Sequence, residues 1–297
     1  MKKLTWSQED FDMLHRNLDA ALRAFLHTKR GRALNAHELR SHLNSREALS
    51  LKAINAAARM SFSAQFSEKI QRLLFDLGVR KFSFVTLDID KHSVPLREAA
   101  SFDVQVCKDL TQQFLNGWNY IGIVEPAFYY QAAFVPAPDG QYFSWHTHAI
   151  VWETTQSALT SRRRAFNQAH QPFVPGCTAA HCRRIDSSSA ESYARYMTKS
   201  IIKEYTAYPK MLAHFDPITG EITKQPSGRW RNRKRPIRPT NLVRAFIAMA
   251  DRTIEDLAFA GGAGSLLYRD ILRSTRLELR MQAANQIAAN RDRLFGN

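Results

Sequence analysis

The eight residues Trp145–Trp152 (WHTHAIVW) constrain the fold more than any other stretch of the chain. Aromatic and β-branched residues dominate this stretch, which predicts a β-strand. Side chains two positions apart on a strand point to the same face, so His146 and His148 project together, followed by Ile150 and Trp152. Two imidazoles placed in this way can bind one metal ion. The alternative is a pair of unrelated, half-buried histidines.

A second segment, Glu191–Lys203, contains no proline or glycine and follows three serines at 187–189 that can cap a helix. We therefore predict a helix over this segment. Side chains three or four residues apart lie on one face of a helix. Here that face carries Tyr193, Tyr196, Lys199 and Lys203.

A His-x-His strand followed by a Tyr-x-x-Lys helix resembles the HUH endonucleases, named for a His-hydrophobic-His motif. The resemblance is closest to the rolling-circle replication initiator (Rep) proteins of plasmids and single-stranded DNA viruses. The residue between the histidines is Thr147, which keeps a β-branched shape. The segment Phe84–Asp88 (FVTLD) resembles the family's first motif, Phe-x-Thr-Leu-Thr, except at Asp88. The three motifs stand in the family's order, and the resemblance covers about residues 79–205.

The resemblance implies a phosphodiester cleavage in which a tyrosine attacks single-stranded DNA at a replication origin. The products are a 5′-phosphotyrosyl link and a free 3′-hydroxyl that primes synthesis. Tyr196 is the expected nucleophile, because it stands three residues before Lys199 as the family motif requires. A free phenol has a pKa of about 10, and Lys199 is expected to lower it or to hold the phosphate. Tyr193 is either a second transferring tyrosine, as in some relatives, or a packing residue.

The resemblance also implies a divalent metal ion, Mg²⁺ or Mn²⁺, held by His146, His148 and an acidic residue. Glu125, at the end of a predicted strand over 120–125, fits the position of the family's acid. The segment between Glu125 and the histidines is longer than in compact family members.

Two other acids are alternatives for the third ligand. Asp139 lies in a predicted turn with Gly140. Glu153 has the opposite strand parity to the histidines, so its side chain should point away from them. Thr86 and Trp145 are expected to be scaffold residues.

The chain carries 42 lysines and arginines against 27 acidic residues, a net charge of +15. Such an excess favours a polyanion such as DNA. Two clusters are candidate nucleic-acid contacts. The first is the triplet Arg162, Arg163 and Arg164, for which a purely solvated face is the alternative. The second is Arg229, Trp230, Arg231, Arg233, Lys234 and Arg235, for which a solvated linker is the alternative.

Several classes of function and location are disfavoured. No stretch approaches the roughly 20 apolar residues of a membrane span, and three cysteines are too few for a disulfide framework, so we expect a cytoplasmic protein. The chain has no Walker-type phosphate loop, so we expect no nucleotide cofactor. A helicase and a polymerase would then come from the host. The alternatives to an initiator are an HUH transposase or relaxase, or a non-catalytic basic DNA-binding regulator.

We predict an α+β fold with a central antiparallel sheet of four or five strands, of the HUH/Rep palm type related to ferredoxin and RRM folds. The histidine strand should be central. The expected divisions are an N-terminal helical region (1–78), an endonuclease domain (79–205), a basic linker (206–240) and a C-terminal helical region (241–297). Two segments of the first region, 36–43 and 46–60, could form a helix-turn-helix, although packing alone would also explain them.

Overall fold

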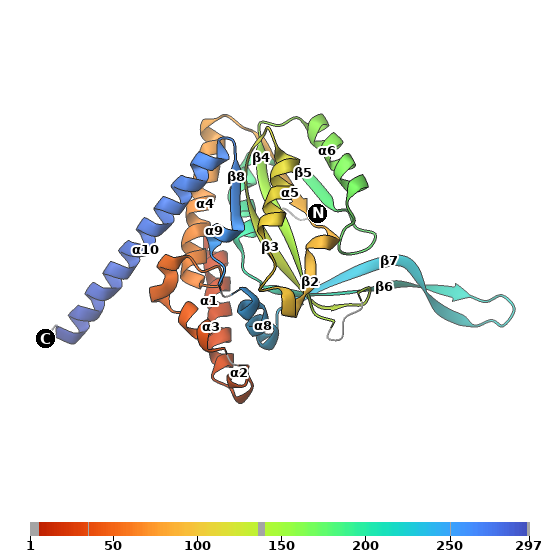
Figure 1. Cartoon of the computed structure of the whole chain (residues 1–297), viewed down its shortest axis with the longest axis horizontal. Helices are drawn as coiled ribbons and strands as arrows, with labels where there is room; N and C mark the ends of the chain where they lie inside the picture. The colour runs from red at the N-terminus through yellow and green to blue at the C-terminus, as the bar shows by residue number, and fades with distance from the viewer. Residues whose placement is uncertain (1–5, 35, 136–139, 250, 296–297) are drawn as a thin grey trace.

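The computed structural model describes residues 6–34, 36–135, 140–249 and 251–295 and has an α+β fold (Figure 1). The helices are α1 (Gln8–Leu26), α2 (Lys29–Arg32), α3 (His37–His42), α4 (Ala56–Asp76), α5 (Gln105–Leu115), α6 (Gln156–Ala169), α7 (Ala190–Thr198), α8 (Pro239–Met249), α9 (Ile254–Leu257) and α10 (Gly264–Phe295). The strands are β1 (Lys81–Leu87), β2 (Ser93–Pro95), β3 (Asn119–Ala132), β4 (Tyr142–Trp152), β5 (Ala180–Asp186), β6 (Lys203–Phe215), β7 (Ile222–Pro236) and β8 (Ala258–Gly261).

The histidine strand β4 lies inside the sheet, between β1 and β3, as predicted. The strand order is β5-β1-β4-β3-β6-β7, with β2 paired to β4 and β8 paired to β3. The sheet has eight strands rather than four or five, and it is not wholly antiparallel, because β3 and β6 run parallel. A parallel pair needs a long crossover connection, and here the chain between β3 and β6 includes α6 and α7.

Helices cover both faces of the sheet (Figure 1). Consecutive side chains of a strand point to opposite faces. Accordingly, the Thr147 hydroxyl lies 2.8 Å from that of Thr111 on α5, whereas the His148 ring faces Tyr196 on α7. α7 packs in turn against α4, which contacts α1 and α10. The face that carries the histidines is therefore the face that α7 covers.

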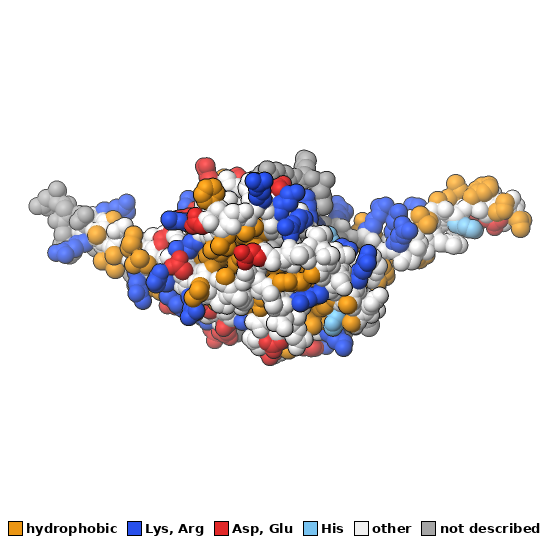
Figure 2. Space-filling view, turned by 90° about the horizontal axis from the view of Figure 1, so that it is seen from above, with side chains coloured by type: hydrophobic (Ala, Val, Ile, Leu, Met, Phe, Trp, Pro, Cys, Tyr) orange, Lys and Arg blue, Asp and Glu red, His pale blue; other side chains and the backbone are white. Residues whose placement is uncertain are grey.

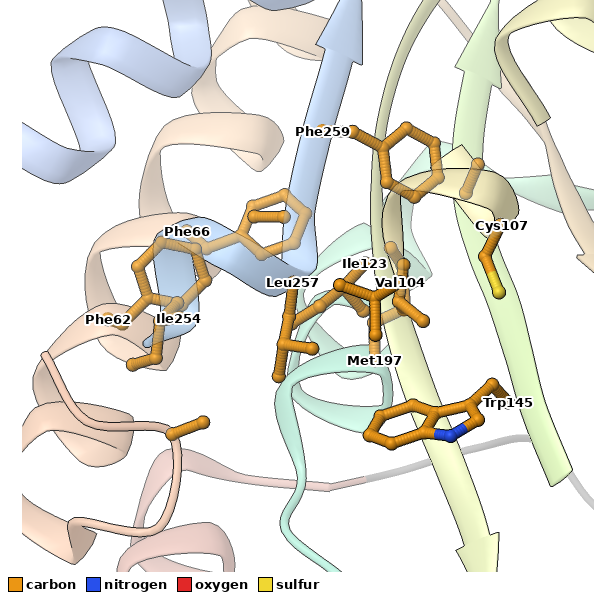
Figure 3. Packing of buried hydrophobic residues seen from close by; sticks show 14 of the residues in the cluster. Phe62, Phe66, Val104, Cys107, Ile123, Trp145, Met197, Ile254, Leu257 and Phe259 are labelled. Carbon is orange, nitrogen blue, oxygen red and sulfur yellow. The ribbon is translucent and has the colours of Figure 1, made fainter. Parts of the chain in front are cut away.

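One continuous cluster of buried apolar side chains runs from the N-terminal helices through the sheet to α10. In Figure 3, Phe62 and Phe66 of α4 lie beside Ile254 of α9, on one side of the sheet, and Trp145 lies on the other side. Burying each large apolar side chain contributes about 1.5–3 kcal/mol. The helical regions that precede and follow the sheet thus share its core.

The N-terminal region contains no helix-turn-helix at the predicted place. After the six-residue helix α3, residues 45–50 form a 3-10 helix, and the second predicted segment, 46–60, is α-helical only from Ala56, where the long helix α4 begins. Asn55 fixes the start of α4, because its side-chain oxygen accepts a hydrogen bond from the amide of Ala58. Its side-chain nitrogen donates to the carbonyls of His42 and Asn44.

The segment predicted as a basic linker, 206–240, is mostly a long two-stranded ribbon formed by β6 and β7, which projects from the body (Figure 1). Pro209 and Pro226 disguised the strands, because proline is uncommon in sheets except at edges and bulges. Both prolines flank an irregularity in the pairing of β6 with β7. The turn is stabilised by the Asp216 carboxylate, which accepts hydrogen bonds from two backbone amides.

α7 ends earlier than predicted, at Thr198, and Lys199 is extended. Two buried side chains hold the chain at this point. The Arg59 guanidinium donates to the carbonyls of Thr198 (2.8 Å) and Lys199 (3.2 Å). The His15 imidazole donates from Nδ1 to its own helix and accepts at Nε2 from the amide of Ser200, at 3.1 Å. α1 and α4 therefore fix the backbone that carries Lys199.

This arrangement predicts a pH dependence of stability. Burial lowers the pKa of His15 to about 4 from an ordinary value of 6.5. Below pH 6.5 the unfolded chain binds a proton at His15 that the folded chain does not, so stability falls as the pH drops from 6.5 to 4, by up to about 3 kcal/mol. We expect His15→Gln to make this decline shallower in urea unfolding measured between pH 7 and pH 4.

The matched control is His27→Gln, at an exposed position, which should keep the wild-type pH dependence. Other buried histidines titrate alike in all three proteins and cancel in the comparison. Parallel curves for wild type and His15→Gln would contradict the assignment.

Candidate active site

Glu125, His146 and His148 form a buried group at the centre of the sheet. Glu125 on β3 stands directly opposite His146 on β4, so their side chains share a face. One ligand atom of each residue lies within 4.8 Å of the others. The three residues predicted as metal ligands are thus together, and this group could hold a metal ion.

Both imidazoles are oriented by contacts at Nδ1. His146 Nδ1 lies 3.3 Å from the Ser144 carbonyl and must donate to it, and His148 Nδ1 lies 2.8 Å from the Thr86 hydroxyl. Such outer contacts orient a metal-binding histidine and leave Nε2 free, and the carbonyl of Ser144 also fixes the tautomer of His146. Within the described part of the chain, His148 Nε2 is buried without a hydrogen-bond partner and lies 3.4 Å from Glu125 Oε2.

The protonation states also suit a cation. Burial lowers the pKa of both histidines, so they are neutral near pH 7 and can donate lone pairs. Burial alone would raise the pKa of Glu125, but the Lys199 ammonium and His148 outweigh it and hold that pKa at about 2. One carboxylate and two neutral imidazoles are ligands accepted by several divalent metals. The donor set therefore fits a divalent ion without identifying it.

Thr86 was expected to be scaffold only, yet its hydroxyl contacts a candidate ligand. The register of β1 with β4 sets this contact, because Thr86 is the partner of His148. Asp88, where the first motif departs from the family, accepts a hydrogen bond from Ser144 at 2.9 Å. Burial raises the pKa of Asp88, and the nearby His146 opposes that effect.

Lys199 forms an ion pair with Glu125, and its ammonium contacts both carboxylate oxygens. Both side chains are buried. A metal ion bound by Glu125 would need the same oxygens. Lys199 therefore competes with a metal for the carboxylate.

Tyr196 borders this group. The ring centroid of Tyr196 lies 5.4 Å from the ring centroid of His148. The Lys199 ammonium lies over the face of the Tyr196 ring, 3.9 Å from its centroid. Burial, together with the Glu125 charge, raises the pKa of Tyr196. From the sequence, Lys199 was expected to lower the pKa of the Tyr196 phenol or to hold the phosphate. In this structure its ammonium pairs with Glu125.

Tyr193 occupies a different environment from Tyr196. It is buried, with ring contacts to Phe82 (5.7 Å between centroids) and Phe84 (4.8 Å). Tyr196 is partly exposed. Of the two tyrosines, Tyr196 borders the site and Tyr193 packs in the core.

A small hollow, with about 50 Å³ of space, opens beside Tyr196 and Glu125. Three lysines line it: Lys199, Lys203 and Lys234. With one acid among its lining residues, the hollow favours an anionic ligand. Trp6 also lines it; its ring lies 6.5 Å from that of Tyr196, and its carbonyl accepts a hydrogen bond from Arg195. Sequence reasoning missed Trp6, because nothing local links it to residues 190 positions away.

The arginine triplet lies away from the site. It is on α6, which packs with α5 on the other face of the sheet. Arg162 donates to the carbonyls of Phe114 and Asn116 and lies over the Trp118 ring, whereas Arg163 and Arg164 are at the surface. Arg162 therefore has a structural role in this fold.

The second cluster lies on β7. Arg229, Arg231 and Arg233 are exposed, whereas Arg235 pairs with Glu204. Trp230, one of the candidate nucleic-acid contacts, packs edge-on against Phe134, with 5.1 Å between the ring centroids.

Of the two alternative acids, Glu153 does not join the site. Glu153 is exposed past the end of β4, where its carboxylate accepts a hydrogen bond from Asn119. Asp139 lies outside the described residues.

Comparison of the chain with protein-family models, curated proteins and solved structures found no match. None of the helices in the described ranges is long and apolar enough to cross a bilayer. What the site does must therefore be argued from its own residues and geometry.

The shared use of Glu125 predicts how Lys199 affects metal binding. Removing one partner of a buried ion pair costs about 3–5 kcal/mol, and a ligand that binds the folded state restores stability. We expect Lys199→Met to melt at a lower temperature than wild type without metal, and to gain more from added Mn²⁺ in a thermal shift experiment.

Lys203→Met is the matched control, since Lys203 lines the same hollow but is exposed and is not bonded to Glu125. It should respond to Mn²⁺ as wild type does. Equal Mn²⁺ shifts in wild type and Lys199→Met would show that lysine and metal do not share the carboxylate.

Proposed function

We propose that this protein is a metal-dependent endonuclease that nicks and rejoins single-stranded DNA through Tyr196, and that it acts as a rolling-circle replication initiator of the HUH/Rep type. One observation carries the proposal. The ring centroid of Tyr196 lies 5.4 Å from that of His148, one of the Glu-His-His group, at the edge of a hollow lined by lysines. Burying the Glu125 carboxylate is costly, and a bound metal ion would offset that cost.

The chain's own residues have three tasks in the reaction. Lys203 and Lys234 attract the phosphates of the strand into the hollow. Tyr196 is the nucleophile, but its raised pKa keeps the phenol protonated at neutral pH, so attack requires loss of that proton. When bound by Glu125, His146 and His148, a divalent ion such as Mg²⁺ or Mn²⁺ would polarise the scissile phosphate and stabilise the charge of the transition state.

The reaction balances as a transfer. The Tyr196 oxygen forms a bond to phosphorus, and the bond from phosphorus to the 3′-oxygen breaks. The phenol loses its proton, and the leaving 3′-oxygen gains one. The products are a 5′-phosphotyrosyl link and a free 3′-hydroxyl. Because the link conserves the phosphodiester, attack by a 3′-hydroxyl reverses the step and rejoins a strand.

The transposases and relaxases of the superfamily would share this chemistry. The packing of Tyr193 favours an initiator that uses one tyrosine over an enzyme that uses two, because the Tyr193 ring contacts Phe82 and Phe84 in the core. A tyrosine held there cannot reach a phosphate in the hollow without leaving its packing contacts.

The nucleophile is tested by removing one hydroxyl at a time. We expect Tyr196→Phe to abolish the covalent adduct with a 3′-labelled single-stranded oligonucleotide pool in Mn²⁺, because the attacking oxygen is gone while the ring contacts remain. Tyr193→Phe is the matched control and should keep most of the adduct. The measurement is a gel shift under denaturing conditions, followed by peptide mapping of the linked tyrosine.

The reverse pattern, in which Tyr193→Phe loses the adduct and Tyr196→Phe keeps it, would assign the nucleophile to Tyr193. Loss of only a second strand transfer in Tyr193→Phe would indicate a two-tyrosine enzyme.

The metal ligands are tested separately from DNA affinity. We expect the double variant His146→Ala/His148→Ala to lose cleavage and Mn²⁺ binding while keeping most of its affinity for DNA. The reason is that affinity comes from cations distributed over the surface. Cleavage, calorimetric Mn²⁺ titration and fluorescence anisotropy would be measured on one preparation. A parallel loss of DNA affinity and cleavage would indicate that the histidines are structural.

A further inference from the structure

The ribbon of β6 and β7, here called the arm (residues 203–236), projects from the body of the protein (Figures 1 and 2). Its base is anchored, because Tyr205, Ala207 and Trp230 join a small apolar cluster on the body. Its outer half, from Met211 to Pro226, is exposed almost throughout. Two strands without a covering layer are marginally stable in water, so a bound partner would stabilise this half.

The arm is strongly cationic. It contains eight lysines and arginines and three acids. Of these acids, Glu204 is buried and paired with Arg235 and Arg238, and Asp216 holds the turn. Figure 2 shows lysine and arginine side chains gathered where the arm leaves the body.

The outer half of the arm has an apolar face. Phe215 is the register partner of Ile222, and Met211 that of Pro226, so these side chains lie on one face. Phe215 is 60% exposed, Ile222 71% and Ile218, in the turn, 93%. Figure 2 shows apolar side chains collected toward the far end of the arm, beyond the cations where it leaves the body. A group of exposed apolar side chains on a projecting element indicates a contact surface.

We propose that the arm binds duplex DNA, with its cations on the phosphates and its apolar end against the bases. The inference deepens the proposed function and rests on it, since the duplex would be the one that flanks the nicked strand. A two-stranded ribbon fits the major groove, about 12 Å wide, where apolar side chains contact thymine methyl groups. From Pro209 to Phe215 the arm extends about 20 Å at about 3.3 Å per residue, more than half of the roughly 34 Å turn of the double helix.

Charge favours duplex DNA over a second copy of this chain as the partner of the exposed ribbon. A second copy of this chain carries a net charge of +15, which repels a cationic arm. An anionic membrane would also attract these cations, so binding to anionic vesicles is measured as part of the test. A duplex presents phosphates along its whole length, which complements the cations at the base of the arm.

The test measures binding of a fluorescein-labelled 20-base-pair duplex by fluorescence anisotropy. EDTA is present so that no cleavage contributes. Arg231→Ala/Arg233→Ala should weaken binding at least tenfold at low salt and reduce the salt slope by about two, since each phosphate contact contributes about 0.9. Phe215→Ser/Ile222→Ser should weaken binding several-fold with an unchanged slope. Arg269→Ala/Arg280→Ala, on exposed arginines of α10, is the charge-matched control and should stay within about twofold of wild type.

Equal losses of duplex affinity in Arg231→Ala/Arg233→Ala and in the α10 control would overturn the inference, because affinity would then depend on total charge alone. It would also be overturned if the wild type sediments as a dimer and Phe215→Ser/Ile222→Ser dissociates that dimer without changing the affinity for DNA. The third contrary outcome is that the wild type binds anionic vesicles and Phe215→Ser/Ile222→Ser loses this binding while its affinity for DNA stays unchanged. Thermal melting of each variant verifies that the body is folded. If the wild type forms no tyrosyl adduct but its duplex affinity depends on the arm, the arm inference stands and the proposed function fails.

Discussion

The buried carboxylate of Glu125 determines how the centre of this protein is built. A charge in the interior is tolerated only when it is paired and hydrogen-bonded. Here Lys199 reaches it from the chain that follows α7, and His148 approaches it from the neighbouring strand. The sheet, the helix above it and the segment after that helix are therefore joined at one side chain, next to the phenol of Tyr196.

The helices at the two ends of the chain have a definite relation to this centre. Arg59 and His15 hold the backbone on either side of the Lys199 side chain, so α1 and α4 set the position of its ammonium. α10 packs on α4 in turn, where Glu278 accepts hydrogen bonds from Ser61 and Gln65. The sequence suggests that these helices are flanking extensions. In the structure they support the site.

Local rules of side-chain direction predicted the site better than its surroundings. Strand parity predicted that His146 and His148 lie on one face, because a pleated strand permits little else. Glu125 lies on the same face of the neighbouring strand, as the register partner of His146. The helix rule placed Tyr196 in a helix, and the resemblance to the family motif singled it out. The helix rule failed for Lys199, which lies past the end of α7 and reaches the site because distant residues hold it. The arm was hidden by its prolines and charges, since an exposed ribbon has no buried face to impose an alternating pattern.

The pairing of β3 has a further consequence for the hollow. Along its outer edge β3 pairs with β8 over residues 120–123 and with β6 from Phe128 onward. The four residues between these ladders, which include Glu125 and Pro126, have no neighbouring strand on that edge within the described ranges. Proline suits this position because it has no amide hydrogen to leave unsatisfied. The hollow is thus a gap in a sheet, and two hydrogen-bonded registers rather than loops fix its width. A ligand therefore meets a preformed rigid slot, and a slip of either register would close it.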